Sequence, residues 1–415
     1  MRKCIACGGK LFDEPLMQLD SMPSSAQNIP DETEVEADGG ISLKLCQCSE
    51  CGLVQFDCEP VDYYRDVIRA GGFSTTMVNL RRGQYRHLIE TYHLEGKRFI
   101  EVGCGRGEFL SVLTEFPVKA YGIEHKKELV RIAREQGLDV REGFTEHGDQ
   151  TIEGAPFDCF LSFNCLEHQP KPNEMLQAVY NSLSEGGMGL VTVPSLEYIL
   201  QYDGYYELIR DHIAYYTFES LRNLMERNGF EVLEEEMVNR DTISVIVRKV
   251  PETAGEDSDK GTDEITGRNA DKITGKETGG KQEVRRMDAA GLKKSRDMIS
   301  REVNGLIDSL HEAGKTAAIW GASHQGFTLA ATTKLGEKVA YIIDSAPFKQ
   351  GRFAPASHIR IVPPDHWKEE PADTILIVAP GYTDEIAGII REKFVKKDGS
   401  RPEILTLKSN HLERL

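Results

Sequence analysis

The sequence predicts an α/β protein whose fold has two larger parts behind a small cysteine-rich module. Apolar runs alternate with helical patterns over residues 63–250 and again over residues 287–415, which is typical of α/β sheets. Each stretch contains a strand, a glycine-rich turn and a helix in succession. Two cysteine pairs lie ahead of both, within residues 1–62.

The composition excludes some classes of partner. The 415 residues carry a formal net charge of -17, and a nucleic-acid-binding protein would need a basic face. No apolar run approaches the length of a membrane span, and the start "MRKCIACGGK" has no signal-peptide core. Nine cysteines without a secretion signal indicate reduced thiols. We therefore expect a cytoplasmic protein with no nucleic-acid or membrane partner.

The first module contains two C-x2-C pairs, Cys4 with Cys7 and Cys48 with Cys51. Each pair lets two thiolates reach one tetrahedral metal, and two pairs complete its coordination shell. Such a zinc ion would be structural, because no ligand position stays open for chemistry. The alternative is four unrelated thiols, which the turn-like settings "CIACGGK" and "CSECGLVQ" disfavour.

The stretch "RFIEVGCGRGEFLSVL" predicts a strand, a glycine turn and a helix. Gly103 and Gly105 allow a sharp turn and a close approach of the backbone to a ligand. Glu101 precedes them, where an acid opposes a pyrophosphate but suits a cationic ligand group. Glu124 ends the next strand, about 20 residues on, where a carboxylate holds ribose hydroxyls.

Further strands complete the first α/β part. "FDCFLSFNCLEHQPKPNEML" is a strand that runs into a loop containing Asn164 and His168, and "GGMGLVTVPS" is the fifth strand. The segments "FEVLEEEMV" and "TISVIVRK", joined by "NRD", form a closing hairpin. This hairpin adds an antiparallel strand to a mostly parallel sheet.

Residues 63–250 together resemble the class I methyltransferases that use S-adenosylmethionine, chiefly through "EVGCGRG", "GIEH" and "NCLEHQP". The resemblance implies a Rossmann-like, seven-stranded sheet. It also implies the cofactor contacts: Glu101, Gly103 and Gly105 at the methionine end, Glu124 at the ribose, and Asn164 near the sulfonium. In "REGFTEH", Phe144 would border the adenine. An NAD-type Rossmann domain is the competing interpretation.

Residues 251–286 contain almost nothing apolar and predict a disordered linker. The second α/β part, residues 287–415, opens on a long helix with one apolar face. Its glycine turn, Gly321 to Gly326, puts a helix N-terminus where an anion can bind. Further donors suit a nucleotide diphosphate group there, and they are Lys349, Arg352 and His358.

The order of the three parts resembles the sugar C-methyltransferases that act on nucleotide-linked keto-deoxysugars. "CSECGLVQ", "DSAPFKQGRFAPASHI" and "APGYTDEI" carry this resemblance, which spans the chain except for the linker and implies a second Rossmann-like domain at the C-terminus. It implies methyl transfer to a ring carbon next to a ketone. The family's base is a His in a Tyr-x-Glu-His pattern, which here reads "IRDH" and contains Asp211 and His212. His168 matches a second active-site His.

Other site residues follow from the same comparison. "DYYRDVIRAGGFSTTM" corresponds loosely to an aromatic and serine segment, which suggests Tyr64 for the substrate and Ser74 for the cofactor. Tyr215 and Tyr216 would donate to sugar or enolate oxygens, and Asp211 would orient a neighbour such as His168. A ring C–H beside a ketone is acidic enough for an imidazole to remove.

Three alternatives remain open on the residues alone. His212 is an ordinary loop residue in one, with the tyrosines as packing. The changed "IRDH" pattern also fits an O-methyltransferase, which would use a His base and the same cofactor. A non-catalytic scaffold of the same fold is the third, although the cofactor residues are all present. The sequence identifies neither the sugar and its nucleotide nor the oligomeric state.

Overall fold

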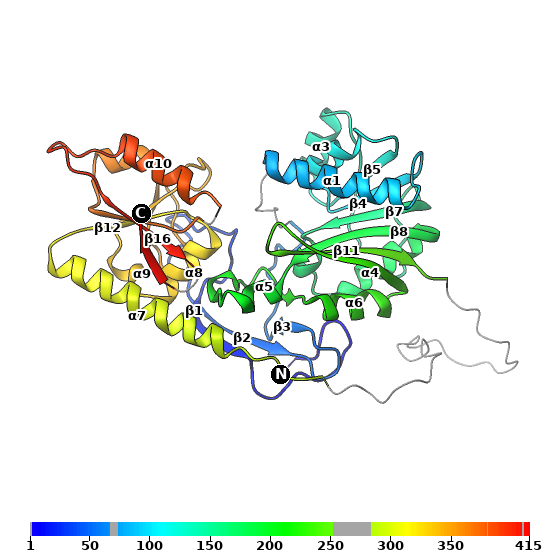
Figure 1. Cartoon of the computed structure of the whole chain (residues 1–415), viewed down its shortest axis with the longest axis horizontal. Helices are drawn as coiled ribbons and strands as arrows, with labels where there is room; N and C mark the ends of the chain where they lie inside the picture. Colours follow the sequence, from blue (N-terminus) through cyan, green and yellow to red (C-terminus); the bar gives the residue numbers. More distant parts are fainter. Residues whose placement is uncertain (1, 67–73, 252–283, 380, 409–410) are drawn as a thin grey trace, which may run out of the picture.

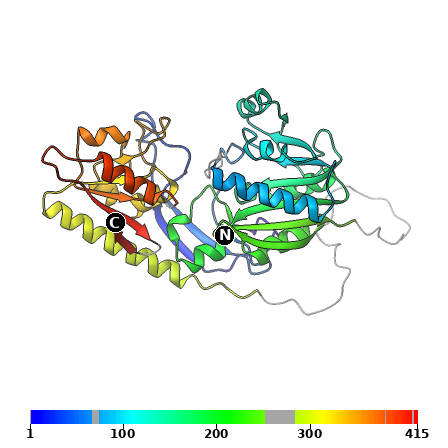
Figure 2. The ribbon, with the colours of Figure 1, turned by 45° about the horizontal axis from the view of Figure 1, so that its top comes forward.

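The computed structural model describes residues 2–66, 74–251, 284–379, 381–408 and 411–415. Two α/β parts lie side by side, and the N-terminal module lies at their junction (Figures 1 and 2). In these described ranges no helix is both long and apolar enough to cross a membrane. The linker predicted over residues 251–286 falls mostly outside them.

The N-terminal module is a four-stranded antiparallel sheet, and one of its strands comes from far along the chain. Its own strands are β1 (Met17–Met22), β2 (Ile41–Gln47) and β3 (Val54–Phe56). The fourth is β9 (Ala214–Tyr215), which pairs with β3 in the order β1-β2-β3-β9. The module is therefore completed by the loop that contains His212.

The second sheet has seven strands in the order β10-β11-β8-β7-β4-β5-β6, which confirms the predicted seven-stranded sheet. Strands β8 to β6 are parallel, whereas β11 and β10 form the expected antiparallel hairpin. The strands are β4 (Arg98–Val102), β5 (Lys119–Glu124), β6 (Asp139–Glu142), β7 (Phe157–Phe163), β8 (Leu183–Pro194), β10 (Phe230–Val238) and β11 (Thr242–Lys249).

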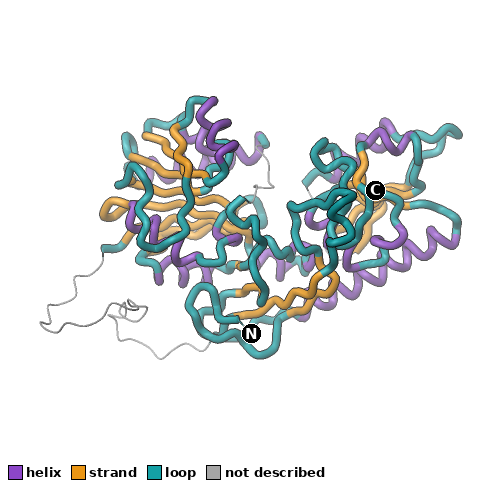
Figure 3. The backbone as a smooth tube through the Cα atoms, turned by 180° about the vertical axis from the view of Figure 1, so that it is seen from behind, coloured by secondary structure: helices purple, strands orange, loops and turns teal. Residues whose placement is uncertain are grey.

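Helices cover both faces of this sheet (Figure 3). Strand β7 is accordingly buried at every position except Asp158, because a strand covered on both faces is apolar throughout. The helices are α1 (Thr75–Thr91), α2 (Glu108–Leu113), α3 (Lys127–Glu135), α4 (Pro172–Ser182), α5 (Leu196–Gln201) and α6 (Phe218–Arg227), with short 3-10 turns η1 (Leu166–His168) and η2 (Tyr205–Glu207).

The connections position the site. From β4 the chain moves outward through β5 and β6 and then returns to β7 on the other side of β4. The strand order therefore reverses at the carboxyl end of β4, and ligands of open α/β sheets bind outside the strand ends at such a reversal.

The C-terminal part has a six-stranded sheet in the order β14-β13-β12-β15-β16-β17, parallel except for β17. The apolar face of helix α7 buries Leu292, Ile299, Val303, Ile307 and Leu310, whereas Leu306 is only partly buried. The elements are α7 (Ala290–Glu312), β12 (Ala317–Trp320), α8 (His324–Thr332), α9 (Leu335–Lys338), β13 (Ile342–Ile343), β14 (Ile361–Val362), η3 (Pro364–Lys368), β15 (Thr374–Ile377), α10 (Thr383–Lys393), β16 (Glu403–Lys408) and β17 (His411–Arg414).

Candidate functional site

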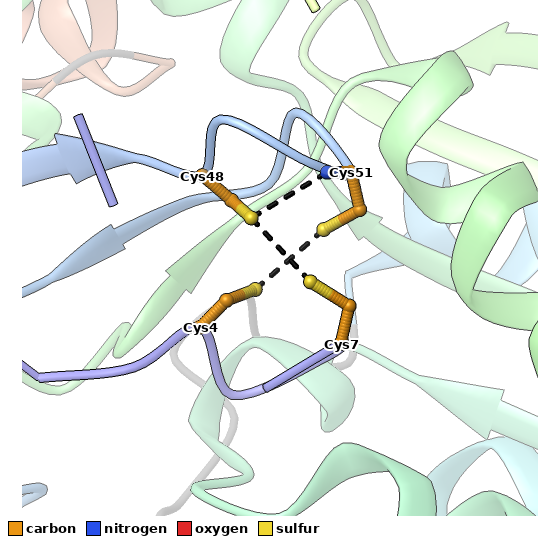
Figure 4. A group of neighbouring side chains, drawn as sticks. All are labelled: Cys4, Cys7, Cys48 and Cys51. Atoms are coloured by element: carbon orange, nitrogen blue, oxygen red, sulfur yellow. Dashed lines mark hydrogen bonds between the residues drawn. The ribbon is translucent and has the colours of Figure 1, made fainter. Parts of the chain in front are cut away.

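The four predicted metal ligands converge on one point (Figure 4). The Sγ atoms of Cys4 and Cys51 lie 3.5 Å apart, those of Cys7 and Cys48 lie 3.4 Å apart, and all four lie within 4.8 Å of one another. Tetrahedral zinc with Zn–S bonds of about 2.3 Å needs sulfurs about 3.8 Å apart. The cluster is compatible with a structural zinc ion.

Backbone amides support the sulfur atoms. The amides of Glu50 and Cys51 both donate to the Cys48 Sγ at 3.4 Å, and the amide of Gly9 donates to the Cys7 Sγ at 3.3 Å. Such outer contacts orient metal ligands and stabilise thiolate charge. With four sulfurs the shell is closed, so a metal here would hold the module together and leave no position for a substrate.

A cavity opens at the carboxyl ends of β4, β5 and β7, where the strand order reverses. Seven of the predicted site residues line it: Tyr64, Gly103, Gly105, Glu124, Phe144, Asn164 and His168. The structure thus brings together most of the residues assigned to the cofactor.

The glycine turn forms the floor of this cavity. Gly103 and Gly105 have φ angles of 72° and 60°, in the left-handed region that favours glycine. The amide of Gly105 donates to the Glu124 Oε2 at 2.9 Å, and the amide of Lys126 donates to Oε1 at 2.8 Å. Each carboxylate oxygen keeps further acceptor capacity, as a ribose diol requires.

Phe144 lines the cavity next to Tyr64 and Arg65. The Arg65 guanidinium lies 5.8 Å from the Phe144 ring and 4.7 Å from the Tyr64 ring, and it forms an ion pair with Glu146. An aromatic ring beside a guanidinium plane suits a flat base such as adenine. Tyr64, predicted for the substrate, therefore lies on the side of the cavity assigned to the cofactor.

Two predicted cofactor residues lie outside the cavity lining. Glu101 is fully buried within β4, below the glycine turn. The Ser74 side chain caps helix α1 by accepting from the amide of Met77 at 3.3 Å. Its position follows from the helix N-terminus, where serine is favoured for this bond.

Asn164 ends β7 with a φ of 49°, which is uncommon for a residue with a side chain and is frequent at functional sites. The Thr192 hydroxyl donates to the Asn164 Oδ1 at 3.3 Å, and the backbone amide of Asn164 donates to the Thr192 carbonyl at 2.8 Å. These bonds to β8 hold the Asn164 side chain at the end of the cavity that is formed by residues 163–169.

The base loop, residues 209–216, meets the cavity wall through His168. The His168 Nδ1 lies 2.7 Å from the carbonyl of Asp211, so Nδ1 carries the proton and Nε2 the lone pair. The rings of His168 and His212 lie 4.8 Å apart. His168 is buried, whereas His212 keeps part of its surface exposed and does not line the cavity.

Asp211 contacts His168 through its backbone rather than its carboxylate. The Asp211 carboxylate accepts from the amide of Ala26 at 2.8 Å and from the hydroxyl of Tyr63 at 2.6 Å. Both donors belong to the N-terminal part of the chain. The Asp211 backbone therefore contacts His168, while its carboxylate holds the base loop against the module.

Both imidazoles favour their neutral form. Desolvation lowers the pKa of His212 well below 6.5, and the nearby His168 and His324 lower it further. Desolvation also lowers the pKa of His168, against the opposing effect of Asp211. His324 begins helix α8, so the C-terminal part takes part in setting the protonation of His212.

The positions of Tyr215 and Tyr216 do not favour the predicted contacts between their hydroxyls and substrate oxygens. Both side chains are buried, and the Tyr215 hydroxyl both accepts from the amide of Ile209 at 2.8 Å and donates to its carbonyl at 3.1 Å. The Tyr216 hydroxyl lies 3.5 Å from the carbonyl of Leu166. The two tyrosines lie close to His212 in the sequence, which suggested contacts with the substrate. In the structure their hydroxyls contact the backbone of Ile209 and Leu166, so their role is structural.

Replacing Tyr215 with phenylalanine tests this structural role. We expect the free energy of unfolding to fall by about 1–3 kcal/mol, because the buried amide of Ile209 loses the Tyr215 hydroxyl as its acceptor. The Ile209 carbonyl loses the hydroxyl as well but keeps its bond from the backbone amide of His212. Chemical denaturation checks this, and the exposed Tyr202 provides the control variant Tyr202→Phe. A raised KM for the sugar at unchanged stability would restore the substrate role.

The three donors predicted for the diphosphate have separate partners. The Lys349 Nζ contacts the Ala322 carbonyl at 2.8 Å and the Asp344 Oδ2 at 3.2 Å, which places it beside the second glycine turn. Arg352 instead donates to the Ile29 carbonyl, and the His358 ring contacts Asp38. Arg352 and His358 therefore connect the C-terminal part to the module.

The comparisons with known proteins decide the family. Residues 77–235 match a family model described as "Methyltransferase domain", and residues 269–401 match "C-methyltransferase C-terminal domain". The C-methyltransferase NovU of Streptomyces niveus is 25% identical over 96% of this chain and 94% of its own length. The chain belongs to the S-adenosylmethionine-dependent C-methyltransferase family. An NAD-type domain and a non-catalytic scaffold are thereby set aside.

Other similarities cover less of this methyltransferase. A ubiquinone biosynthesis O-methyltransferase of Nitrosococcus oceani is 34% identical over 23% of the chain and 42% of its own length. The solved magnesium protoporphyrin IX methyltransferase of Synechocystis PCC 6803 is 14% identical, with a TM-score of 0.34, and covers 45% of this chain and 93% of its own. The PH0226 protein of Pyrococcus horikoshii OT3 has a TM-score of 0.37 at 15% identity, covering 45% and 98%.

Tyr63 and Arg65 are two residues of this site that sequence reasoning missed. Tyr63 contacts Asp211, and Arg65 lines the cavity. Both residues flank Tyr64. The sequence therefore pointed to the correct segment, but to Tyr64 rather than to Tyr63, which contacts the base loop. A pair of adjacent tyrosines in an irregular stretch gives no signal for which one points inward.

Proposed function

We propose that this C-methyltransferase transfers a methyl group to a ring carbon, next to a ketone, of a nucleotide-linked keto-deoxysugar. The observation that carries the proposal is the His168–His212 pair at the end of the cavity, with both imidazoles neutral. A neutral imidazole can take a proton, and removal of a ring C–H is the step that methylation at carbon requires.

S-adenosylmethionine, when bound, supplies an electrophilic methyl group on its sulfonium. The proposed cofactor residues are Glu124 for the ribose, Phe144 for the adenine, and the turn at Gly103 and Gly105 for the methionine end. Asn164, which also lines the cavity, would lie near the sulfonium. These residues hold and orient the cofactor, and positioning of this kind supplies much of the rate of a bimolecular transfer.

His212 is the proposed base. The His212 ring is partly exposed, so a substrate that approaches the open side of the cavity could reach it. His168 lies between the His212 ring and the interior of the cavity. The proton of the ring C–H would pass to His212, and the electron pair of that bond would form the new carbon–carbon bond to the methyl group. The methyl–sulfur bond would break at the same time, and its electron pair would stay on the sulfur, which becomes a neutral thioether. His168 keeps an unprotonated Nε2 and supports the charge that develops on the neighbouring ring.

The nucleotide is proposed to lie on the C-terminal part. Lys349 beside the glycine turn at Gly321 remains the candidate for the diphosphate. Gly321 has a φ of 122°, and an added Cβ would lie 2.5 Å from the Val378 carbonyl, so the turn requires glycine. Glu207 of η2 accepts from His324 and Gln325 of α8, which brings this region next to the base loop.

Solvent exchange tests the proposal. With S-adenosylhomocysteine in place of the cofactor, the protein should exchange the ring proton of a nucleotide-linked 4-keto sugar with deuterium, detected by NMR. Methyl transfer to oxygen requires no such exchange. Turnover without any exchange into the ring carbon would favour the O-methyltransferase alternative.

The pH dependence of the rate follows from the lowered pKa of His212. Because the base must be neutral, kcat should stay constant as the pH falls to 6.5 and decline only below it. The unfolded chain binds protons near pH 6.5 while the folded protein resists them, so the free energy of unfolding should also fall below that pH. A kcat profile whose acidic limb is centred at or above 6.5 would contradict this role.

A further inference from the structure

We propose that the four-cysteine centre positions the base loop through strand β9. This inference rests on the proposed role of His212, which lies two residues before β9. The centre itself has no open ligand position, so its influence on catalysis must pass through the chain. Three sets of contacts provide the route.

The first set joins the module to the residues after His212. Strand β9 pairs with β3, with Val54 opposite Tyr215 and Gln55 opposite Ala214. The amide of Phe56 also donates to the carbonyl of Ile213 at 3.0 Å. The backbone immediately after His212 is therefore an edge strand of the module's sheet.

The second set joins the module to the residues before His212. The Arg210 guanidinium donates to three carbonyls, those of Ser24 at 3.1 Å, Glu59 at 3.2 Å and Pro60 at 3.3 Å. The Asp211 carboxylate accepts from Ala26 and Tyr63, as described above. His212 is thus held from both sides by residues 24–63.

The third set joins the cysteines to β3. The amide of Cys48 donates to the Leu53 carbonyl at 2.8 Å, directly before β3. The buried Gln55 side chain accepts from the amide of Ile5, between Cys4 and Cys7, at 2.9 Å. Both cysteine pairs therefore attach to the strand that pairs with β9. Without a metal, the four sulfurs lose the bond that holds the two pairs together.

The cofactor cavity depends much less on this route. Its floor, with Gly103, Gly105 and Glu124, comes from the ends of β4 and β5 in the seven-stranded sheet, and only its rim, with Tyr64, Arg65 and His168, lies next to the module or the base loop. Metal removal should therefore disorder the base loop while the cofactor still binds. A general loss of structure would affect both together.

Hydrogen exchange of the full chain tests the proposal before and after zinc removal by a chelator. We expect amides in residues 209–217 to exchange at least about tenfold faster without metal and to recover when Zn²⁺ is restored. Strands β4 and β7 should keep their protection, and the affinity for S-adenosylhomocysteine should stay within about twofold. The value of kcat should fall about 100-fold, because small misplacements of a catalytic group have effects of this size.

Two glutamines of the same sheet provide a matched pair of variants. Gln55→Ala removes the contact to Ile5, whereas Gln47→Ala removes contacts to Arg285 and Met287 on the far side of the sheet. Only Gln55→Ala should speed exchange in residues 209–217 and lower kcat at unchanged KM for the cofactor. Amide hydrogen exchange is measured without a sugar, so the exchange result stays valid even if the proposed substrate class is wrong.

Two outcomes would overturn the proposal. In one, residues 209–217 keep their protection after the metal is removed. In the other, β4 and β7 lose protection to the same extent, or both glutamine variants behave alike, which would show a general stabilising role for the module.

Discussion

Replacing His212 with alanine is expected to lower kcat by about 10²–10⁴-fold, the usual contribution of a general base. The same variant should stop deuterium exchange at the ring carbon. Its affinity for S-adenosylhomocysteine should stay within about twofold of wild type, because His212 does not line the cavity that we assign to the cofactor. Single-turnover kinetics, NMR exchange and calorimetric titration measure the three quantities.

The exposed His147 of the same α/β part gives the matched control, and His147→Ala should leave all three quantities unchanged. If His212→Ala exchanges the ring proton at the wild-type rate, the base lies elsewhere. His168 would then be examined next, because it lines the cavity and carries its lone pair on Nε2.

Replacing Glu124 with alanine is expected to raise the dissociation constant for S-adenosylmethionine by at least about 100-fold. Two ribose hydroxyls would lose a charged acceptor, and each such bond contributes about 1.5–3 kcal/mol. The amides of Gly105 and Lys126 would also lose their partner, which loosens the glycine turn. Isothermal titration measures the effect, and kcat at saturating cofactor should be much less affected.

Glu142 is the control for this change, since it is exposed and lies opposite Glu124 on the neighbouring strand β6. Glu142→Ala should bind the cofactor normally. Equal weakening in both variants would point to charge rather than ribose recognition, and normal binding by Glu124→Ala would remove Glu124 from the cofactor site.

The parts that the sequence predicted well are those in which function and local structure share a short segment. The turn at Gly103 and Gly105 follows a strand and begins a helix, so its motif specifies both its backbone and its place in the sheet. The cysteine pairs likewise carry their own geometry, since Cys4 and Cys7 can reach one ion only in a tight turn. The closing hairpin was visible from two apolar strands and a short connection.

The parts that could not be predicted depend on contacts between distant segments. Asp211 bonds to Ala26, 185 positions away, and Arg352 bonds to Ile29, 323 positions away. Nothing near either residue indicates such a partner. A charged side chain in a single sequence looks the same whether it binds a ligand or holds two parts of the chain together, and here the structure favours the second role for Arg352.

The central claim is methyl transfer to a sugar ring carbon, and one measurement tests it most directly. The purified protein is incubated with S-adenosylmethionine that carries carbon-13 in its methyl group and with a panel of nucleotide-linked 4-keto sugars, and the product is examined by NMR. We predict a labelled methyl group bonded to a ring carbon adjacent to the ketone. A label on oxygen would contradict the enolate mechanism, and binding of the cofactor without transfer to any sugar in the panel would contradict the proposed substrate class.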